Sequence, residues 1–139
     1  MSSEWKNMNI YWTDIYYHLH YPHQEKITHQ VIRILQHVEK RDKVGVNDIA
    51  SYLKVSQNTA SEHIKRVIQK GLLIKNRDTE DERKIILQLT DEGKKVVYRN
   101  TSLDENKLDK LFAALTKKEQ EQVHDAFQLV SERAKQCML

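Results

Sequence analysis

The clearest hydrophobic pattern in the chain lies between Ser56 and Gly71. Apolar residues recur there at i, i+4, i+7 and i+8, the spacing of one helix face, and they are Ala60, Ile64, Val67 and Ile68. Ser56 is a good N-cap because its hydroxyl can accept a hydrogen bond from a backbone N–H of the next turn. Gly71 can supply the left-handed residue that ends the helix. The pattern predicts a helix with one face in the core and a polar face free for a partner.

Two shorter patterns precede this helix. We expect Thr28 and Asn47 each to cap a helix, because both are good N-cap residues that precede apolar positions at helical spacing. The inward residues are Val31, Ile34, Leu35 and Val38 in the first helix, and Ile49, Ala50 and Leu53 in the compact second one. Residues 54–56 form a tight turn into the helix described above. A short helix, a tight turn and a second helix with a polar face make a helix-turn-helix.

A hairpin is predicted after the helix-turn-helix. Leu72–Ile74 and Ile85–Leu89 are apolar strand candidates, and the segment between them, residues 75–84, is too polar for the core and rich in turn formers. A hairpin in this place is a wing.

Helices are also predicted at both ends of the chain. The N-terminal one runs from Trp5 to Leu19 with a heptad rhythm, and a loop over residues 21–27 follows because Pro22 breaks the helix. Thr90 caps a helix with Asp91 and Glu92 in its first turn, and apolar residues up to Leu115 suggest one long helix that Asn100–Ser102 could bend or break. A final helix begins at Thr116, with Glu119 completing a capping box, and its apolar positions are Val123, Phe127, Val130 and Ala134.

Composition fits a mainly helical protein with one small β-hairpin. Of 139 residues, 39% are hydrophobic and 31% charged, with three glycines and one proline, which favours a charge-rich helical fold over a sandwich or barrel. We expect one domain, 1–139, with a winged helix-turn-helix lobe at 28–90 flanked by terminal helices at 1–21 and 91–139. The net charge of +3 is too small by itself to indicate nucleic acid, so the positions of the charges decide.

Targeting signals and cysteines point to the cytoplasm. No apolar run approaches the length of a membrane span, and the N-terminus MSSEWKNMN lacks the apolar core of a signal peptide. The single cysteine, Cys137, cannot form an internal disulfide, which suits a reducing compartment. We therefore expect a cytoplasmic protein.

The run DIASYLKVSQNTASEHIKRVIQKGLLIKNRDTEDERKIILQLTDEG resembles the MarR family of bacterial winged-helix transcription regulators. Its most specific pieces are the KGLLIK turn, the D-x-R of Asp81–Arg83 and the LTDEG of Leu89–Gly93, and the DERK wing is also similar to SarA-type regulators. The resemblance covers residues 28–97 by motif. It implies a homodimer in which the terminal helices interlock and two winged lobes grip a pseudo-palindromic operator, with repression as the expected mode.

The polar face of the central helix carries side chains suited to reading DNA. A helix fits the major groove, where Gln or Asn suits adenine, Ser or Thr is less selective, and cations one turn further on meet phosphates. The predicted residues are Ser56, Gln57, Asn58, Thr59, Ser61, Glu62, Lys65 and Arg66. An ordinary solvated face is the alternative, which the neighbouring short helix and wing make the weaker interpretation.

By resemblance, Arg83 is the wing-tip arginine that enters the minor groove, and Asp81 steadies it through a hydrogen-bonded ion pair. A narrow minor groove concentrates negative potential and attracts arginine. Arg77 and Lys84, with Lys75 behind them, would add phosphate contacts. The acidic residues of the wing count against this interpretation, and a plain surface hairpin is the alternative for the basic residues other than Arg83.

The terminal helices carry more apolar surface than a chain of this size can easily bury alone. The predicted dimerisation residues are Trp5, Met8, Trp12, Ile15, Leu19, Leu108, Leu111, Val123, Phe127 and Val130. Some MarR relatives bind aromatic or phenolic anions between the dimer helices and the DNA-binding lobe. Trp12, Tyr16 and Tyr17 could line such an effector pocket, although an aromatic stripe at helical spacing is more often core.

Other classes of function have weaker support. The sequence has no glycine-rich phosphate loop, nucleophile elbow or helical metalloprotease motif, so we expect neither an enzyme nor a cofactor. His18, His20, His23 and His29 cluster in sequence without a standard ligand spacing, so no metal site is predicted and a zinc-responsive regulator is only an alternative. Cys137 stands at the opposite end of the chain from the reactive cysteine of peroxide-sensing relatives. A winged-helix protein-interaction module, or antirepressor, is the other alternative.

Overall fold

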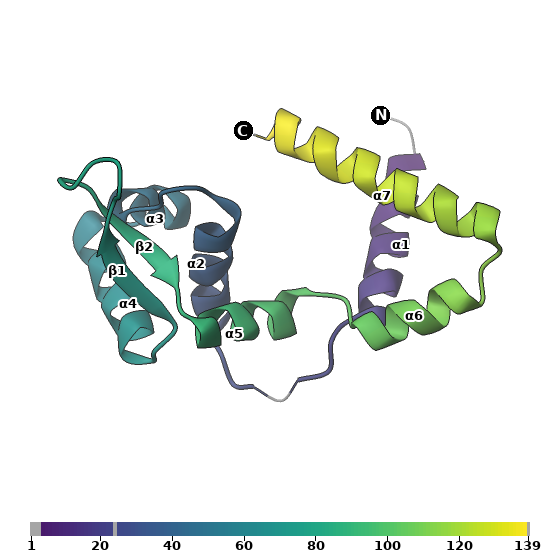
Figure 1. Ribbon diagram of the computed structural model, residues 1–139, viewed down its shortest axis with the longest axis horizontal. Coiled ribbons are helices and arrows are strands. Elements are labelled where there is room, and N and C mark those ends of the chain that lie inside the picture. The colour runs from purple at the N-terminus through teal and green to yellow at the C-terminus, as the bar shows by residue number, and fades with distance from the viewer. Residues whose placement is uncertain (1–3, 24, 139) are drawn as a thin grey trace. The chain divides into compact units, whose positions relative to one another are not determined.

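The computed structural model describes residues 4–23 and 25–138, which form two compact units. One unit runs from Tyr21 to Ser102, and the other joins the chain up to His20 with the chain from Leu103 onward. Within the described residues the elements in chain order are α1 (Glu4–Leu19), α2 (His29–Lys40), α3 (Val46–Leu53), α4 (Gln57–Gln69), β1 (Leu73–Arg77), β2 (Ile85–Leu89), α5 (Asp91–Thr101), α6 (Glu105–Ala113) and α7 (Lys117–Cys137) (Figure 1). The predicted fold class, mainly helical with one β-hairpin, is confirmed.

The core of the first unit is the predicted helix-turn-helix. Helix α3 packs against α4, and α2 packs against α5 and β2. The buried side chains come from the predicted apolar stripes, and the fully buried ones include Ile34, Leu35, Ile49, Ile64 and Val67. These stripes bury because helical spacing places them on one face of each helix, which confirms most of the predicted core, with Val31, Leu53 and Ile68 only partly buried at its edge.

Three of the four caps around the helix-turn-helix follow the sequence. Thr28 and Ser56 each accept a hydrogen bond from a backbone N–H three residues on, and Gly71 has a φ of 79° at the end of α4. The prediction that Asn47 caps α3 is wrong. The cap is Gly45, whose N–H donates to Asp48 Oδ2 at 2.8 Å, so the helix begins at Val46. Asp48 competes successfully because it sits at the third helical position, from which a carboxylate reaches back to the cap.

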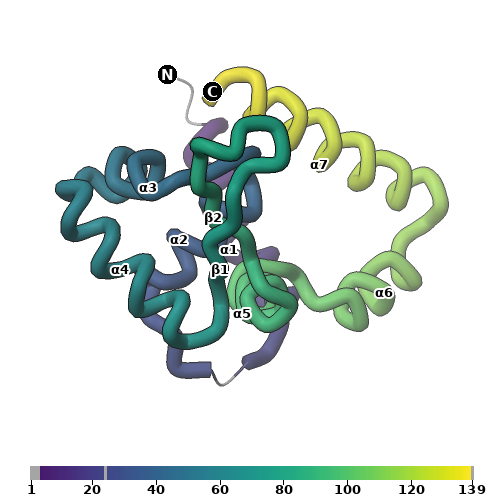
Figure 2. Tube along the Cα trace, turned by 60° about the vertical axis from the view of Figure 1, so that its left-hand side comes forward, coloured from purple at the N-terminus to yellow at the C-terminus, as the bar shows by residue number. Residues whose placement is uncertain are grey.

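The wing is an antiparallel pair of strands (Figure 2). Leu73 pairs with Leu89 and Arg77 with Ile85, so β1 extends beyond the predicted Leu72–Ile74 into the polar segment. Polar residues fit there because one face of a two-stranded wing is open to solvent. The loop between the strands is therefore shorter than predicted and spans residues 78–84.

The apolar pattern from Thr90 to Leu115 forms two helices, α5 and α6, so the break that Asn100–Ser102 could introduce is present. Thr90 caps α5 by accepting from Gly93 N at 2.9 Å, as predicted. At the other end, Thr101 Oγ1 donates to the Val97 carbonyl and Ser102 adopts an extended conformation, which stops α5. Asp104 then caps α6 by accepting from Asn106 N at 3.3 Å. Short polar side chains that bond to the backbone favour such breaks over a continuous helix.

The second unit contains α1, α6 and α7. The capping box predicted at Thr116 is confirmed, because Glu119 N donates to Thr116 Oγ1 and Thr116 N donates to Glu119 Oε1. Asp104 N donates to the Leu19 carbonyl at 2.8 Å, which ties the start of α6 to the end of α1. None of these three helices has a fully buried residue. Among the described residues, no helix combines the length and apolar character needed to span a bilayer.

Candidate nucleic-acid interface

Helix α4 presents its predicted reading face to solvent. All eight predicted residues of this helix and its cap, from Ser56 to Arg66, are exposed, while Ala60, Ile64 and Val67 on the other side are buried. The Ser56 hydroxyl accepts from Thr59 N at 3.1 Å and donates to Thr59 Oγ1 at 2.9 Å. These two hydroxyls are therefore partly occupied by the cap, and the first turn offers the amides of Gln57 and Asn58 as its least engaged polar groups.

Arg83 and Asp81 form the predicted ion pair at the tip of the wing. Arg83 Nε lies 3.2 Å from Asp81 Oδ1, and Arg83 N donates to the same oxygen at 3.1 Å. The Arg83 side chain is 92% exposed. The hydrogen bond from the Arg83 side chain, followed by that from its backbone, lowers the pKa of Asp81. The Asp81 carboxylate thus stays charged and holds the Arg83 guanidinium in a solvent-exposed position that is open to a partner.

The rest of the wing tip is closed by backbone hydrogen bonds. Asp78 N donates to the Lys84 carbonyl at 2.9 Å, and Lys84 N donates to the Asp81 carbonyl at 2.9 Å. Arg77 Nη1 donates to the Glu82 carbonyl at 2.8 Å. Arg77, predicted as a phosphate contact, therefore braces the tip with its side chain. The Lys84 side chain is exposed and forms no hydrogen bond with another described residue.

Sequence reasoning missed an ionic cluster at the start of the tip. Asp78 is only 3% exposed, and its Oδ2 lies 3.5 Å from Lys43 Nζ, which also forms an ion pair with Glu80. The hydrogen bond with Glu80 is the main cause that raises the pKa of Lys43. Nothing in the sequence distinguishes Asp78 within the acidic run of the wing, and Lys43 is distant in sequence.

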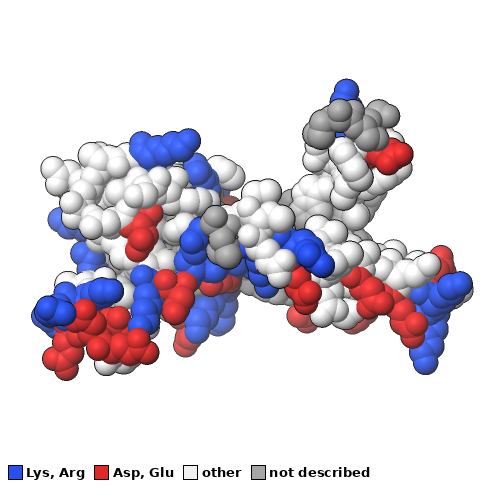
Figure 3. All heavy atoms as spheres, turned by 90° about the horizontal axis from the view of Figure 1, so that it is seen from above, with Lys and Arg blue, Asp and Glu red and all other residues white. Residues whose placement is uncertain are grey.

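Charge on the molecule is mixed in sign. Figure 3 shows Lys and Arg side chains interspersed with Asp and Glu side chains on the face it presents. This agrees with the small net charge of +3. The face shown has no broad basic surface that would by itself indicate nucleic-acid binding. The argument for DNA therefore depends on the positions of a few cations on α4 and the wing.

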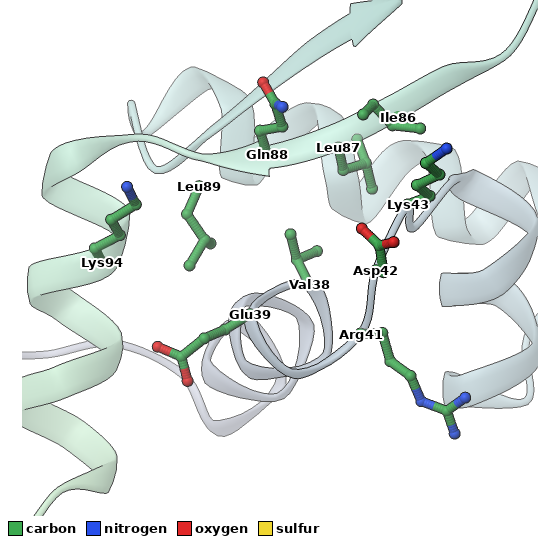
Figure 4. A pocket seen from close by; sticks show the side chains of 10 residues that line it. All are labelled: Val38, Glu39, Arg41, Asp42, Lys43, Ile86, Leu87, Gln88, Leu89 and Lys94. Carbon is green, nitrogen blue, oxygen red and sulfur yellow. The ribbon is translucent and has the colours of Figure 1, made fainter. Parts of the chain in front are cut away.

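A surface pocket of about 520 Å³ lies between α2, β2 and the start of α5. Val38, Leu87 and Leu89 supply apolar side chains along its floor, with Glu39 and Lys94 at one end (Figure 4). Asp42 and Lys43 line the other end. Charged side chains of both signs therefore line the pocket.

The predicted dimerisation residues gather around an apolar groove in the second unit. The groove measures about 620 Å³ and is bounded by α1, α6 and α7. Six of the ten predicted residues line it, namely Ile15, Leu19, Leu108, Leu111, Val123 and Phe127. The other four, Trp5, Met8, Trp12 and Val130, are exposed on α1 and α7. These helices thus leave apolar side chains uncovered within one protomer.

Trp12, Tyr16 and Tyr17, predicted for an effector pocket, lie on α1. Trp12 and Tyr17 are 52% and 73% exposed, and Tyr16 stacks on His20 with ring centroids 5.2 Å apart. None of the three lines the pockets described above. Among the described residues, no group of three His, Cys, Asp or Glu side chains is placed to hold a metal ion. Cys137 is exposed in the last turn of α7.

The fold and this interface define a winged-helix protein. The family described as transcriptional regulator SarA/Rot matches residues 20–99, which include the helix-turn-helix, the wing and most of α5. The chain belongs to this family, and the predicted DNA-binding transcriptional regulator of the MarR and SarA type is confirmed. No curated protein has a significant sequence match to the chain.

Solved structures of MarR-type regulators are similar to the chain. A mutant of MepR from S. aureus, bound to an oligodeoxyribonucleotide, is 27% identical over 76% of this chain and 79% of its own, with a TM-score of 0.51. MepR bound to ethidium bromide is 23% identical, with coverage of 95% and 96% and a TM-score of 0.59. A MarR-like regulator from Thermotoga maritima is 17% identical, with coverage of 97% and 98% and a TM-score of 0.64. The last two similarities concern the fold.

Proposed function

We propose that the chain is a sequence-specific repressor that binds a pseudo-palindromic operator in double-stranded DNA as a homodimer. The observation that carries the proposal is the exposed polar face of α4, which shares one compact unit with a wing whose tip presents Arg83. The MepR mutant was solved with a bound oligodeoxyribonucleotide, and it is similar to this chain over three quarters of its length. A regulator of this kind works where the chromosome is, so we place it in the bacterial cytoplasm and assign it no enzymatic activity.

Each part of the interface has its own task in this proposal. Gln57 and Asn58 read base edges in the major groove, where amide side chains suit adenine. Thr59, Ser61 and Glu62 add weaker selectivity, with Ser56 fixing the start of the helix. Lys65 and Arg66 contact phosphates and set the position of the helix. On the wing, Arg83 enters the minor groove, Asp81 orients it, and Lys84 and Arg77 lie beside the backbone.

The homodimer is supported by the apolar groove of the second unit. A protomer that leaves Leu111, Phe127 and Val130 exposed on helices without a fully buried residue needs another surface to cover them. A second copy with two-fold symmetry supplies that surface and also the second half-site reader. Relief of binding by a small aromatic or phenolic effector, with Trp12, Tyr16 and Tyr17 in its pocket, stays a prediction.

The direct test is a gel shift with duplex DNA from upstream of the chain's own coding region. We expect the wild type to bind and Arg83→Ala to bind about tenfold more weakly or worse, because the minor-groove contact is lost. Arg133→Ala, which removes the same charge from exposed α7, is the matched control and should bind like the wild type. Equal binding by Arg83→Ala would contradict the role of the wing. Absence of binding by every variant at low salt would favour the protein-interaction module.

A further inference from the structure

The wing tip is a braced unit from Asp78 to Arg83. The backbone bonds from Asp78 N to the Lys84 carbonyl and from Lys84 N to the Asp81 carbonyl close the loop on itself. Asp78 Oδ1 also accepts from Glu80 N at 3.1 Å. Asp81 Oδ1 accepts from both the backbone N and the side-chain Nε of Arg83. These contacts form one continuous chain of hydrogen bonds from Asp78 to the guanidinium of Arg83.

Asp78 is in turn attached to the segment between α2 and α3. Its buried carboxylate lies 3.5 Å from Lys43 Nζ, and Glu80 is the second carboxylate on the same ammonium. The next residue along, Val44, is buried, and its carbonyl accepts a hydrogen bond from Leu87 N at 2.7 Å. The segment at Lys43 is therefore fixed to the base of the wing by the backbone and to its tip by the side chain.

The backbone at Lys43 is in an uncommon conformation. Its φ is 53°, in the left-handed region that residues with a side chain rarely adopt. Such residues persist where the surrounding contacts determine them strongly, and they often occur at sites with a mechanical or functional task. In this conformation the Lys43 ammonium lies between the two wing carboxylates.

We propose that Lys43 and Asp78 form a clamp that sets the position of the wing, and thereby of Arg83, on DNA. The inference rests on the proposed function, since it assigns positioning residues for the same interface. The clamp residues do not themselves need to touch DNA. The Lys43 ammonium is engaged by carboxylates, and the Asp78 carboxylate is buried.

The clamp and a purely electrostatic role for the cluster predict opposite changes in DNA affinity when a wing carboxylate is removed. Removing a negative charge near a phosphate backbone should tighten binding. Removing the carboxylate that fixes the wing should weaken it. Asp78→Asn and Glu82→Gln each remove one wing carboxylate, but the exposed Glu82 contributes only its backbone carbonyl to the bracing of the tip. This makes Glu82→Gln the matched control.

The test measures affinity for the upstream duplex by fluorescence anisotropy. We expect Asp78→Asn to bind about tenfold more weakly than the wild type and Glu82→Gln to bind equally or more tightly. In the Arg83→Ala background, Asp78→Asn should cause little further loss, because the clamp acts through Arg83. Lys43→Arg should keep most of the affinity, whereas Lys43→Gly should lose it while remaining folded, since glycine adopts the left-handed conformation without strain.

Three results would overturn the clamp. They are tighter binding by Asp78→Asn, an equal loss from Asp78→Asn with and without Arg83, and wild-type affinity in Lys43→Gly. Each of these results counts against the clamp only when the wild type binds the duplex and Arg83→Ala weakens that binding. If those two conditions fail, the proposed function fails and not only the clamp. Unfolding curves for Asp78→Asn and Lys43→Gly separate loss of position from loss of fold.

Discussion

His37 and Tyr52 form a stacked pair between α2 and α3, with ring centroids 4.1 Å apart and an interplanar angle of 21°. The Arg33 guanidinium carbon lies 5.2 Å from the centre of the Tyr52 ring. Partial burial is the main cause that lowers the pKa of His37, and the nearby charge of Arg41 acts in the same direction, against Asp48. The folded protein therefore favours a neutral His37 ring.

This pair predicts a pH dependence of folding stability. Because the pKa of His37 is lower in the folded state, the unfolded chain takes up the proton first as the pH falls. The contribution of His37 to the free energy of unfolding should be fully present above about pH 6.5, the usual pKa of a histidine in the unfolded chain. It should decline as the pH falls from there through the lower pKa of the folded state. Urea unfolding between pH 5 and 8 should show this decline, and His37→Phe should reduce it. An unchanged slope in His37→Phe would show that the pair is not responsible.

Local chemistry explains which elements the sequence predicts correctly. The caps at Thr28, Ser56, Thr90 and Thr116 are confirmed because each needs only the residue itself and an N–H three positions on. Asn47 is not the cap because the carboxylate of the next residue, Asp48, accepts a hydrogen bond from Gly45 N and so fixes the start of the helix two residues earlier. The extension of β1 into polar sequence depends on pairing with β2, which hydrophobic patterning within β1 alone does not reveal.

In the candidate site, too, local contacts were predictable from the sequence and long-range contacts were not. The Asp81–Arg83 pair was predictable because the D-x-R motif of the similar family implies it, and the two residues are close enough in sequence to pair locally. The contact of Lys43 with the wing joins groups 37 residues apart, so it exists only once α2, α3 and β2 have packed. Likewise, the aromatic residues of α1 look alike in sequence, yet the structure exposes Trp12 and Tyr17 and half-buries Tyr16.

The contact between α5 and the turn before β1 yields a prediction at the level of elements. A Cβ added to Gly93 would lie 2.1 Å from the Leu72 carbonyl oxygen, which is backbone and cannot move alone. Gly93→Ala should therefore reduce the free energy of unfolding by about 1–3 kcal/mol through overpacking. Lys95→Ala, at an exposed position of the same helix, is the control, because it shortens a solvent-facing side chain and adds no atom to the packing. Similar denaturation midpoints for the two variants would contradict the close packing of α5.

At the scale of the whole molecule, the proposed homodimer depends on the apolar groove. Phe127 lines the groove on α7, and Gln122 lies exposed on the same helix outside it. Phe127→Asp places a charge in the proposed interface and should shift the protein from dimer to monomer, because an unpaired buried charge is costly. Gln122→Asp should leave the dimer intact. Sedimentation velocity distinguishes the two states, and a dimer that survives Phe127→Asp would place the interface elsewhere.

Dimerisation and DNA binding together determine how strongly salt should weaken the complex. One winged lobe reads a half-site, so two lobes held together make twice as many phosphate contacts as one. If these amount to about 6–10, salt should weaken the complex steeply, because each contact releases condensed counterions.

The salt dependence of binding to the upstream duplex is therefore the most direct test of a dimeric DNA-binding repressor. Anisotropy titrations at 50 and 200 mM salt should show an affinity that falls by roughly 10³ to 10⁵, with two protomers bound per duplex at saturation. An affinity independent of salt, or no complex even at 50 mM, would contradict a dimeric DNA-binding repressor.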